Sequence, residues 1–133
     1  STAVGNALNS NTLVVLVTGD VAFQYDLNGL TTIDEVPKNL RIVVINNGGG
    51  EIFRWLEGPE SLGLVDKYFE TKPRTSVKAA AEYCGLNYFC ARNQKETQKA
   101  MDEMMQNNAA SILEVVTDGL KSTEVYKTIL SKK

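Results

Sequence analysis

The sequence predicts a three-layer α/β/α domain built on a mostly parallel sheet. Two apolar runs, Leu13–Val17 and Ile42–Ile45, lack the alternation of a half-exposed strand. Such continuous runs are typical of parallel strands buried on both faces. Strands that alternate with helical segments along the chain also indicate parallel pairing. Both runs end in Gly, Asp or Asn residues, at the sheet edge where parallel α/β domains bind ligands.

The first part of the chain predicts one strand–helix–strand unit of the usual right-handed kind. The expected elements, in chain order, are a helix at Ser1–Leu8 that begins on a capping Ser or Thr, a strand at Leu13–Val17, a loop at Asp20–Ala22, a helix at Tyr25–Val36 and a strand at Arg41–Ile45. Leu27, Leu30 and Ile33 recur at helical spacing, and Pro37 ends that helix.

The second part predicts two further strands and three helices. The expected elements are an irregular connection at Glu57–Thr75, a helix at Val77–Cys84 closed by Gly85, a strand at Leu86–Ala91, a helix from Asn93 with Glu96 at the capping-box distance, a strand at Ile112–Val116 interrupted by Glu114, and a final helix capped by Ser122. The apolar stripes expected to face the core are Thr97, Ala100, Met101, Met104 and Met105 in one helix and Val125, Tyr126, Ile129 and Leu130 in the other. Lys67, Lys72 and Arg74 in the connection are either solvated or contacts for an acidic substrate.

Composition excludes several classes of function. A chain of 133 residues with 23% charged residues and a net charge of −2 is expected to form one domain without a basic surface for nucleic acid. The chain has no histidine, which excludes Ser-His-Asp nucleophiles and histidine metal sites. Cys84 and Cys90 have neither a redox nor a zinc spacing, so we expect two buried thiols.

No apolar run approaches the roughly 20 residues that span a bilayer. Ser1–Ser10 has neither the basic start nor the apolar segment of a signal peptide. We therefore expect a cytoplasmic protein without a membrane span.

Oxygen-bearing residues follow both apolar runs. Asp20 offers a carboxylate, Asn47 offers an amide oxygen, and the glycines Gly48–Gly50 can present a bare backbone carbonyl. Mg²⁺ prefers such oxygens and takes the rest of its shell from phosphate and water. Glycines also let the backbone approach a phosphate closely. The pattern predicts a Mg²⁺–diphosphate site, although Asp20 could instead cap a helix and Asn46-Asn47 could simply form a turn.

The same residues carry a family resemblance. Gly19-Asp20, followed about two dozen residues later by Asn46-Asn47, resembles the diphosphate-binding motif of thiamine diphosphate (ThDP) enzymes. Many members have Gly where Val21 stands. The stretches YDLNGL (25–30) and NNGGGEIF (46–53) are similar to one branch, the MenD-like 2-succinyl-5-enolpyruvyl-6-hydroxy-3-cyclohexene-1-carboxylate synthases of menaquinone biosynthesis.

The resemblance implies a set of site residues. ThDP would lie against Gly19, Asp20, Val21, Ala22, Asn47, Gly48, Gly49 and Ile52, with Mg²⁺ or Mn²⁺ held by Asp20, Asn47 and the Gly49 carbonyl. Family members often carry a hydroxyl where Ala22 stands, and this chain lacks it. Ile52, Phe53 and Leu56 would form an apolar wall against the substrate, with core packing as the alternative.

The resemblance also implies an activity. Such synthases decarboxylate 2-oxoglutarate and add the resulting carbanion to isochorismate. Their activating glutamate comes from a separate domain of a neighbouring subunit, so no catalytic residue is expected in this chain. Residues 1–133 would be the single C-terminal diphosphate-binding domain of a multidomain homodimer or homotetramer. The chain would lack the domain's first segment and be inactive alone.

Two alternatives remain open. One is the same domain of another ThDP-dependent decarboxylase or of an acetolactate synthase relative. The other is a non-enzymatic α/β module that binds a nucleotide at the same strand ends. Neither GxGxxG nor GxxxxGK[ST], the usual nucleotide loops, occurs in the sequence.

Overall fold

The computed structural model describes residues 1–50, 54 and 71–131 of the chain. This part contains one sheet of four parallel strands in the order β1–β2–β4–β3. The elements are α1 (Thr2–Leu8), β1 (Val14–Gly19), α2 (Asp20–Tyr25), α3 (Asn28–Thr31), β2 (Leu40–Asn46), α4 (Val77–Tyr83), β3 (Asn87–Ala91), α5 (Gln94–Gln106), β4 (Ser111–Val116) and α6 (Gly119–Leu130). The predicted parallel α/β fold is confirmed, and the four strands lie within two residues of their predicted ends.

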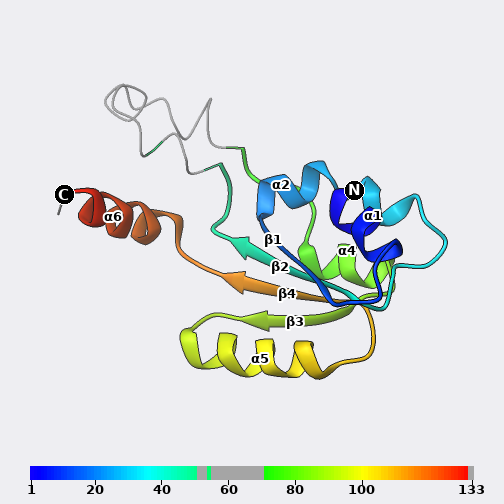
Figure 1. Ribbon diagram of the computed structural model, residues 1–133. Helices are drawn as coiled ribbons and strands as arrows, with labels where there is room; N and C mark the ends of the chain where they lie inside the picture. The colour runs from blue at the N-terminus through cyan, green and yellow to red at the C-terminus, as the bar shows by residue number, and fades with distance from the viewer. Residues whose placement is uncertain (51–53, 55–70, 132–133) are drawn as a thin grey trace.

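Helices cover the two faces of the sheet unequally (Figure 1). On one face α1, α2 and α4 bury a large core that includes Ile42 and Val44 of β2 and Ile112 of β4. On the other face α5 packs alone, and Met104 is fully buried with Val43 and Leu113. In the described part, the sheet therefore lies between a layer of several helices and a second layer that consists of α5 alone.

The strand β1 differs from the prediction that both of its faces are buried. Its side chains alternate between half-buried and exposed, and Val15 and Val17 are 44% and 65% exposed. The reason is position: β1 and β3 are the two edge strands, and α5 packs on β3 and β4, at the far side of the sheet from β1. The prediction holds for Leu40–Val44 of β2, which are all buried.

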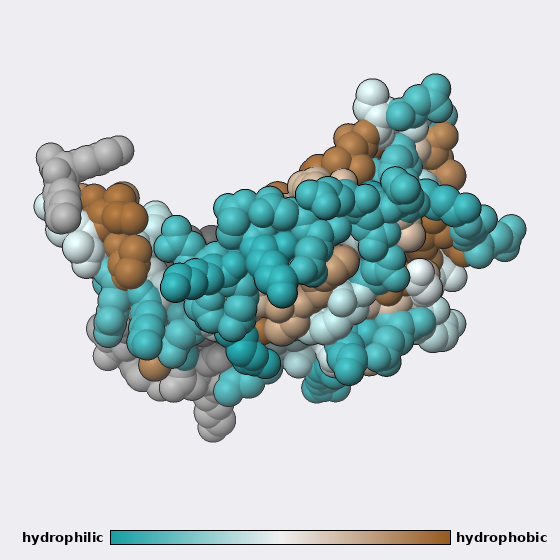
Figure 2. Space-filling view, turned by 90° about the horizontal axis from the view of Figure 1, so that it is seen from below, coloured by the Kyte–Doolittle hydropathy of each residue, from teal (hydrophilic) through white to brown (hydrophobic). Residues whose placement is uncertain are grey.

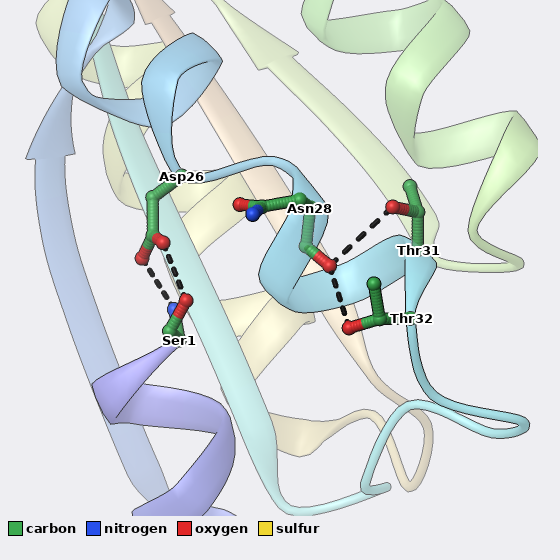
Figure 3. A network of polar contacts seen from close by, with 5 residues as sticks. All are labelled: Ser1, Asp26, Asn28, Thr31 and Thr32. Carbon is green, nitrogen blue, oxygen red and sulfur yellow. Dashed lines mark hydrogen bonds and ion pairs between the residues drawn. The ribbon is translucent and has the colours of Figure 1, made fainter.

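The predicted helix Tyr25–Val36 is wrong. Asp20–Ala22 is the first turn of α2 rather than a loop, and α2 ends at Tyr25. The one-turn helix α3 follows and ends at Thr31, where the Thr31 and Thr32 hydroxyls both donate to the Asn28 carbonyl, as Figure 3 shows. Hydroxyls that satisfy a carbonyl in this way compete with continuation of a helix. Leu27, Leu30 and Ile33 still pack on the core, as predicted.

The start of α1 packs against the segment between α2 and α3. The Ser1 hydroxyl donates to the Asp26 carboxylate at 2.5 Å (Figure 3). A Cβ at Gly29 would lie 2.6 Å from the Ser1 nitrogen, so only glycine allows this approach. Because Ser1 bonds to Asp26, its side chain makes no capping bond to α1, contrary to the prediction.

The helices α4 and α5 form largely as predicted. Gly85 after α4 has a φ of +69°, the left-handed conformation expected of a C-terminal glycine. Asn93 caps α5 by accepting from the Glu96 N–H at 3.0 Å. Met104 faces the core, but Met105 is 37% exposed, so the predicted methionine stripe is narrower than expected. Cys84 is half-buried and Cys90 exposed, so the expectation of two buried thiols is wrong for Cys90.

The last helix is the largest departure from the prediction. It begins at Gly119 and is capped by Asp118, which precedes the predicted cap Ser122 by four residues. Val125, Ile129 and Leu130 were expected to face the core, yet each is at least half exposed. Figure 1 shows α6 projecting beyond the carboxyl end of β4, and hydrophobic side chains colour that end of the molecule brown in Figure 2. None of the described helices is long and apolar enough to cross a bilayer.

A buried cation secures the amino end of the sheet. Arg41, the second residue of β2, is 2% exposed. Its guanidinium donates to the backbone carbonyls of Lys38 (2.8 Å), Leu40 (3.0 Å), Met104 (2.8 Å) and Asn107. Desolvation lowers the pKa of Arg41. These bonds join the loop before β2 to the end of α5.

Candidate functional site

The site lies where β1 and β2 end, and Asp20 is its central side chain. The parallel register pairs Gly19 with Ile45, so the residues after both strands emerge at the same edge of the sheet. Asp20 is 4% exposed. One carboxylate oxygen accepts from the Val21 N–H at 2.8 Å and the other from the Gly48 N–H at 3.0 Å. The carboxylate therefore joins the start of α2 to the turn after β2.

Burial alters both the pKa and the charge balance of the Asp20 carboxylate. Desolvation raises the pKa of Asp20, and the backbone N–H groups of Val21 and Gly48 offset part of that rise. Between described residues, no salt bridge includes Asp20. Among the described residues its negative charge is thus balanced by backbone N–H dipoles, which favours the approach of a cation.

The glycine turn after β2 leaves open space at its surface. Gly48 and Gly49 have φ angles of +92° and +152°, which side-chain-bearing residues rarely adopt. A Cβ placed on Gly48 or on Gly19 would meet nothing within 4 Å. A ligand oxygen can therefore reach the backbone of both strand ends without displacing a side chain.

The two asparagines that end β2 differ in their contacts. Asn46 accepts from the Gly48 N–H at 3.1 Å through Oδ1 and donates to Glu114 at 2.5 Å through Nδ2. Asn47 is half-buried, and its side chain makes no hydrogen bond in the part of the chain that the structure describes. The amide oxygen of Asn47 is therefore available to a ligand.

Glu114 is a site residue that the sequence analysis did not assign. It is 8% exposed in the middle of β4, and it accepts from Asn46 and from the Tyr88 hydroxyl. Burial and the Glu114 carboxylate raise the pKa of Tyr88, which keeps this hydroxyl as a donor. The available signal was the interruption itself, because a charge in a strand buried on both faces needs partners.

The remaining predicted residues fall into two groups. Val21 is half-buried and Ala22 exposed in the first turn of α2, directly after Asp20. Ile52, Phe53 and Leu56 lie outside the described residues.

The Gly50 N–H donates to the Thr71 carbonyl at 3.2 Å, so residues 50 and 71 are adjacent. Next to them, Gln24 of α2 accepts from the Arg74 N–H at 2.6 Å.

The donor set fits a hard divalent cation. Asp20 would supply one carboxylate and Asn47 one amide oxygen, and Gly49, which is buried, would supply a backbone carbonyl. The described residues contain no group of three or more His, Cys, Asp or Glu side chains that could hold a metal. A cation at this edge would therefore need oxygens from backbone, water and a bound phosphate, which is the pattern that Mg²⁺ favours.

Comparison with known families gives a match over most of the chain. Residues 1–115 match the family described as "Thiamine pyrophosphate enzyme, C-terminal TPP binding domain". The chain is 42% identical over 128 residues to the 2-succinyl-5-enolpyruvyl-6-hydroxy-3-cyclohexene-1-carboxylate synthase of Cytophaga hutchinsonii. It is 39% identical over 130 residues to the enzyme of that name from Bacteroides thetaiotaomicron. Each alignment covers 96% of this chain, which spans 23% of the length of these relatives.

Solved structures share the fold. A benzoylformate decarboxylase from Polynucleobacter necessarius superposes with a TM-score of 0.71 over 88% of this chain and 23% of its own, at 24% identity. A thiamine diphosphate-dependent 4-hydroxybenzoylformate decarboxylase from Rhodococcus jostii gives 0.70 over 87% of this chain and 22% of its own, at 22% identity. At these identities the likeness concerns the arrangement of strands and helices.

Proposed function

The chain belongs to the thiamine pyrophosphate enzyme family, as its C-terminal TPP binding domain, and we propose that it holds the diphosphate of ThDP through a Mg²⁺ ion. The observation that carries this proposal is the hydrogen bond from the Gly48 N–H to Asp20, at the ends of the two strands that bear the family-like motif. This bond links Asp20, a buried carboxylate directly after β1, to the open glycine turn after β2.

Each residue of the site would have a separate task. Asp20, Asn47 and the Gly49 carbonyl would ligate Mg²⁺, or Mn²⁺ in its place. The backbone of Gly19, Val21, Ala22 and Gly48 would lie along the diphosphate. Ile52, Phe53 and Leu56 would line the substrate side. When bound, the cofactor supplies the electron sink for decarboxylation, while the protein supplies binding, orientation and charge.

We propose further that the whole enzyme is a MenD-like synthase. It would decarboxylate 2-oxoglutarate and transfer the remaining unit to isochorismate, in the cytoplasm, as a homodimer or homotetramer. The identity of 42% with a synthase of that name supports this choice over the decarboxylases, whose likeness is at the level of fold. Residues 1–133 would be its C-terminal domain. Since the activating glutamate is expected on another domain, the chain would be inactive alone.

Thermal melting tests the site directly. The chain is melted with ThDP and Mg²⁺, with ThDP and EDTA, and with Mg²⁺ and ATP. Ligand at about 100 times its Kd adds roughly 2.7 kcal/mol of stability, a rise of several degrees for a domain of this size. We expect that rise only with ThDP and Mg²⁺, and we expect Asp20→Ala to abolish it.

The same melts define what would contradict the proposal. A rise that persists in EDTA, or one that ATP reproduces, would indicate a nucleotide or general anion site instead. If the chain gives no rise, the melts are repeated on the full-length enzyme. Absence of a Mg²⁺-dependent rise there would refute the ThDP assignment.

A further inference from the structure

Hydrogen bonds lead from the sheet interior to Asp20 in an unbroken series. The Tyr88 hydroxyl donates to Glu114 on the central strand β4. Glu114 accepts from Asn46 at 2.5 Å, and Asn46 accepts from the Gly48 N–H at 3.1 Å. That same N–H donates to Asp20 at 3.0 Å. Glu114 is therefore three hydrogen bonds away from Asp20 and contacts neither Asp20 nor Asn47.

The two ends of this series fix the orientation of the Asn46 amide. The Gly48 N–H can only donate, so it requires an oxygen from Asn46. The Glu114 carboxylate offers acceptors, so it requires the amide nitrogen. A flipped amide would place donor against donor at Gly48. The carboxylate therefore determines which atom of Asn46 faces the glycine turn.

β4 holds the backbone of Asn46 as well as its side chain. The Thr117 N–H, just after β4, donates to the Asn46 carbonyl at 2.8 Å. Asn46 is thus fixed at its side chain by Glu114 and at its main chain by Thr117. Among the described residues, no hydrogen bond joins Asn47 or Gly48 to β4, and the Gly48 N–H is held by Asn46 together with Asp20.

We propose that Glu114 is a positioning residue for the cation–diphosphate site: by orienting Asn46 it sets the glycine turn that presents the Asn47 and Gly49 oxygens. The inference rests on the proposed function for the identity of what the turn holds. The hydrogen-bond series itself does not depend on a ligand. Residues that orient the ligands of a metal commonly change its affinity 10–100-fold when replaced.

Three variants separate positioning from general stability. Glu114→Leu removes both acceptors at similar volume. Glu114→Gln keeps an oxygen for the Asn46 amide nitrogen and a polar group for Tyr88. Leu113→Ala is the matched structural control, since Leu113 is fully buried next to Glu114 but faces α5 on the opposite side of the sheet. Mg²⁺ affinity is measured by calorimetry in saturating ThDP, on the whole chain, at a temperature where all variants are folded.

We expect Glu114→Leu to weaken Mg²⁺ binding about tenfold or more. Glu114→Gln should stay within about threefold of wild type, and Leu113→Ala within about twofold although it melts at a lower temperature. Unchanged affinity in Glu114→Leu would overturn the inference. An equal loss in Leu113→Ala would also overturn it, because the effect would then follow stability rather than orientation.

A second measurement needs no ligand. Hydrogen exchange of the Gly48 amide, followed by NMR in EDTA, reports whether its bonds to Asn46 and Asp20 persist. We expect Glu114→Leu to speed this exchange about tenfold, with Glu114→Gln and Leu113→Ala near wild type. If the full-length enzyme does not bind ThDP and Mg²⁺, the proposed function fails, yet this exchange still decides whether Glu114 positions the turn. Unchanged exchange in Glu114→Leu would refute the positioning role.

Discussion

A buried charge lies beside each end of β2, Arg41 within the strand and Asp20 at the start of α2, and the two charges are satisfied in opposite ways. At the amino end, the Arg41 guanidinium donates to four backbone carbonyls, so four of its five N–H groups are occupied by the chain itself. At the carboxyl end, each oxygen of Asp20 accepts one backbone N–H. A carboxylate has about four lone-pair positions, so Asp20 keeps more of its hydrogen-bonding capacity unused than Arg41 does.

The two charged groups also differ in how fully the chain encloses them. The carbonyls around Arg41 belong to the loop before β2 and to the end of α5, which close over it. Beside Asp20, the space at Gly48 is open for at least 4 Å. Burial of a charge therefore does not by itself indicate a binding site. Unused hydrogen-bonding capacity next to open space does.

The largest expected effect concerns the amino end. Arg41→Met should lower the free energy of unfolding by about 3 kcal/mol or more, because two buried and two part-buried carbonyls lose their donor. Urea denaturation measures the loss, and Mg²⁺–ThDP affinity at a temperature where the variant is folded should be unchanged. Lys38→Met is the control: its side chain is 75% exposed, and its carbonyl, which Arg41 uses, remains. A loss of stability below about 1 kcal/mol for Arg41→Met would contradict the view that Arg41 serves the stability of the fold while Asp20 serves binding.

An intermediate effect is expected from alanine substitutions at two glycines that share a positive φ angle but lie in different parts of the molecule. Gly48 and Gly85 both have positive φ angles and open space at Cβ. Alanine at either should cost about 1–2 kcal/mol of stability, because the left-handed backbone is strained with a side chain. Only Gly48→Ala should also abolish the Mg²⁺-dependent rise in melting temperature with ThDP, since its methyl occupies the open space. Equal retention of that rise in both variants would show that the turn is not a ligand surface.

The smallest expected effect is a pH dependence at Asp20. Burial raises the pKa of the folded carboxyl above 3.8, so ionisation costs more in the folded than in the unfolded chain. The stability of wild type relative to Asp20→Asn should therefore fall as the pH rises from below 3.8 through the raised pKa, and stay constant above it. Urea unfolding in EDTA across this range measures the difference, in which other titrating groups cancel. If the stability of wild type relative to Asp20→Asn instead rises with pH over this range, the backbone N–H donors outweigh burial in setting the pKa of Asp20.

Prediction from sequence worked best where a local pattern sets a global geometry. Continuous apolar runs identified the strands, and parallel strands must bring their carboxyl ends to one edge. Asp20 and the Asn46–Gly50 stretch therefore had to be neighbours, as the bond from Gly48 to Asp20 shows. The positive φ angles of Gly48 and Gly85 likewise follow from residue type and position.

Prediction failed where the deciding contact is distant in sequence. Of the helix expected at Tyr25–Val36, only the one-turn α3 at Asn28–Thr31 forms as a helix after α2, and Gly29 within it lies against Ser1 at the start of the chain. The final helix has an apolar stripe, but a stripe does not specify the surface that it covers. Along β1 the apolar run is the same as in a central strand, and only its edge position exposes Val15 and Val17.

Residue patterns alone predict the parallel α/β fold and the sheet edge at which β1 and β2 end, and they name Asp20, Asn47 and Gly48–Gly49 as the oxygens and the turn of the proposed site. That Glu114 reaches Asn46 across 68 residues, and that Arg41 donates to carbonyls at the end of α5, follows only from how the elements pack. The physical reason is that strand and turn preferences act between near neighbours. A buried charge is instead satisfied by whichever groups the finished packing brings within hydrogen-bonding distance.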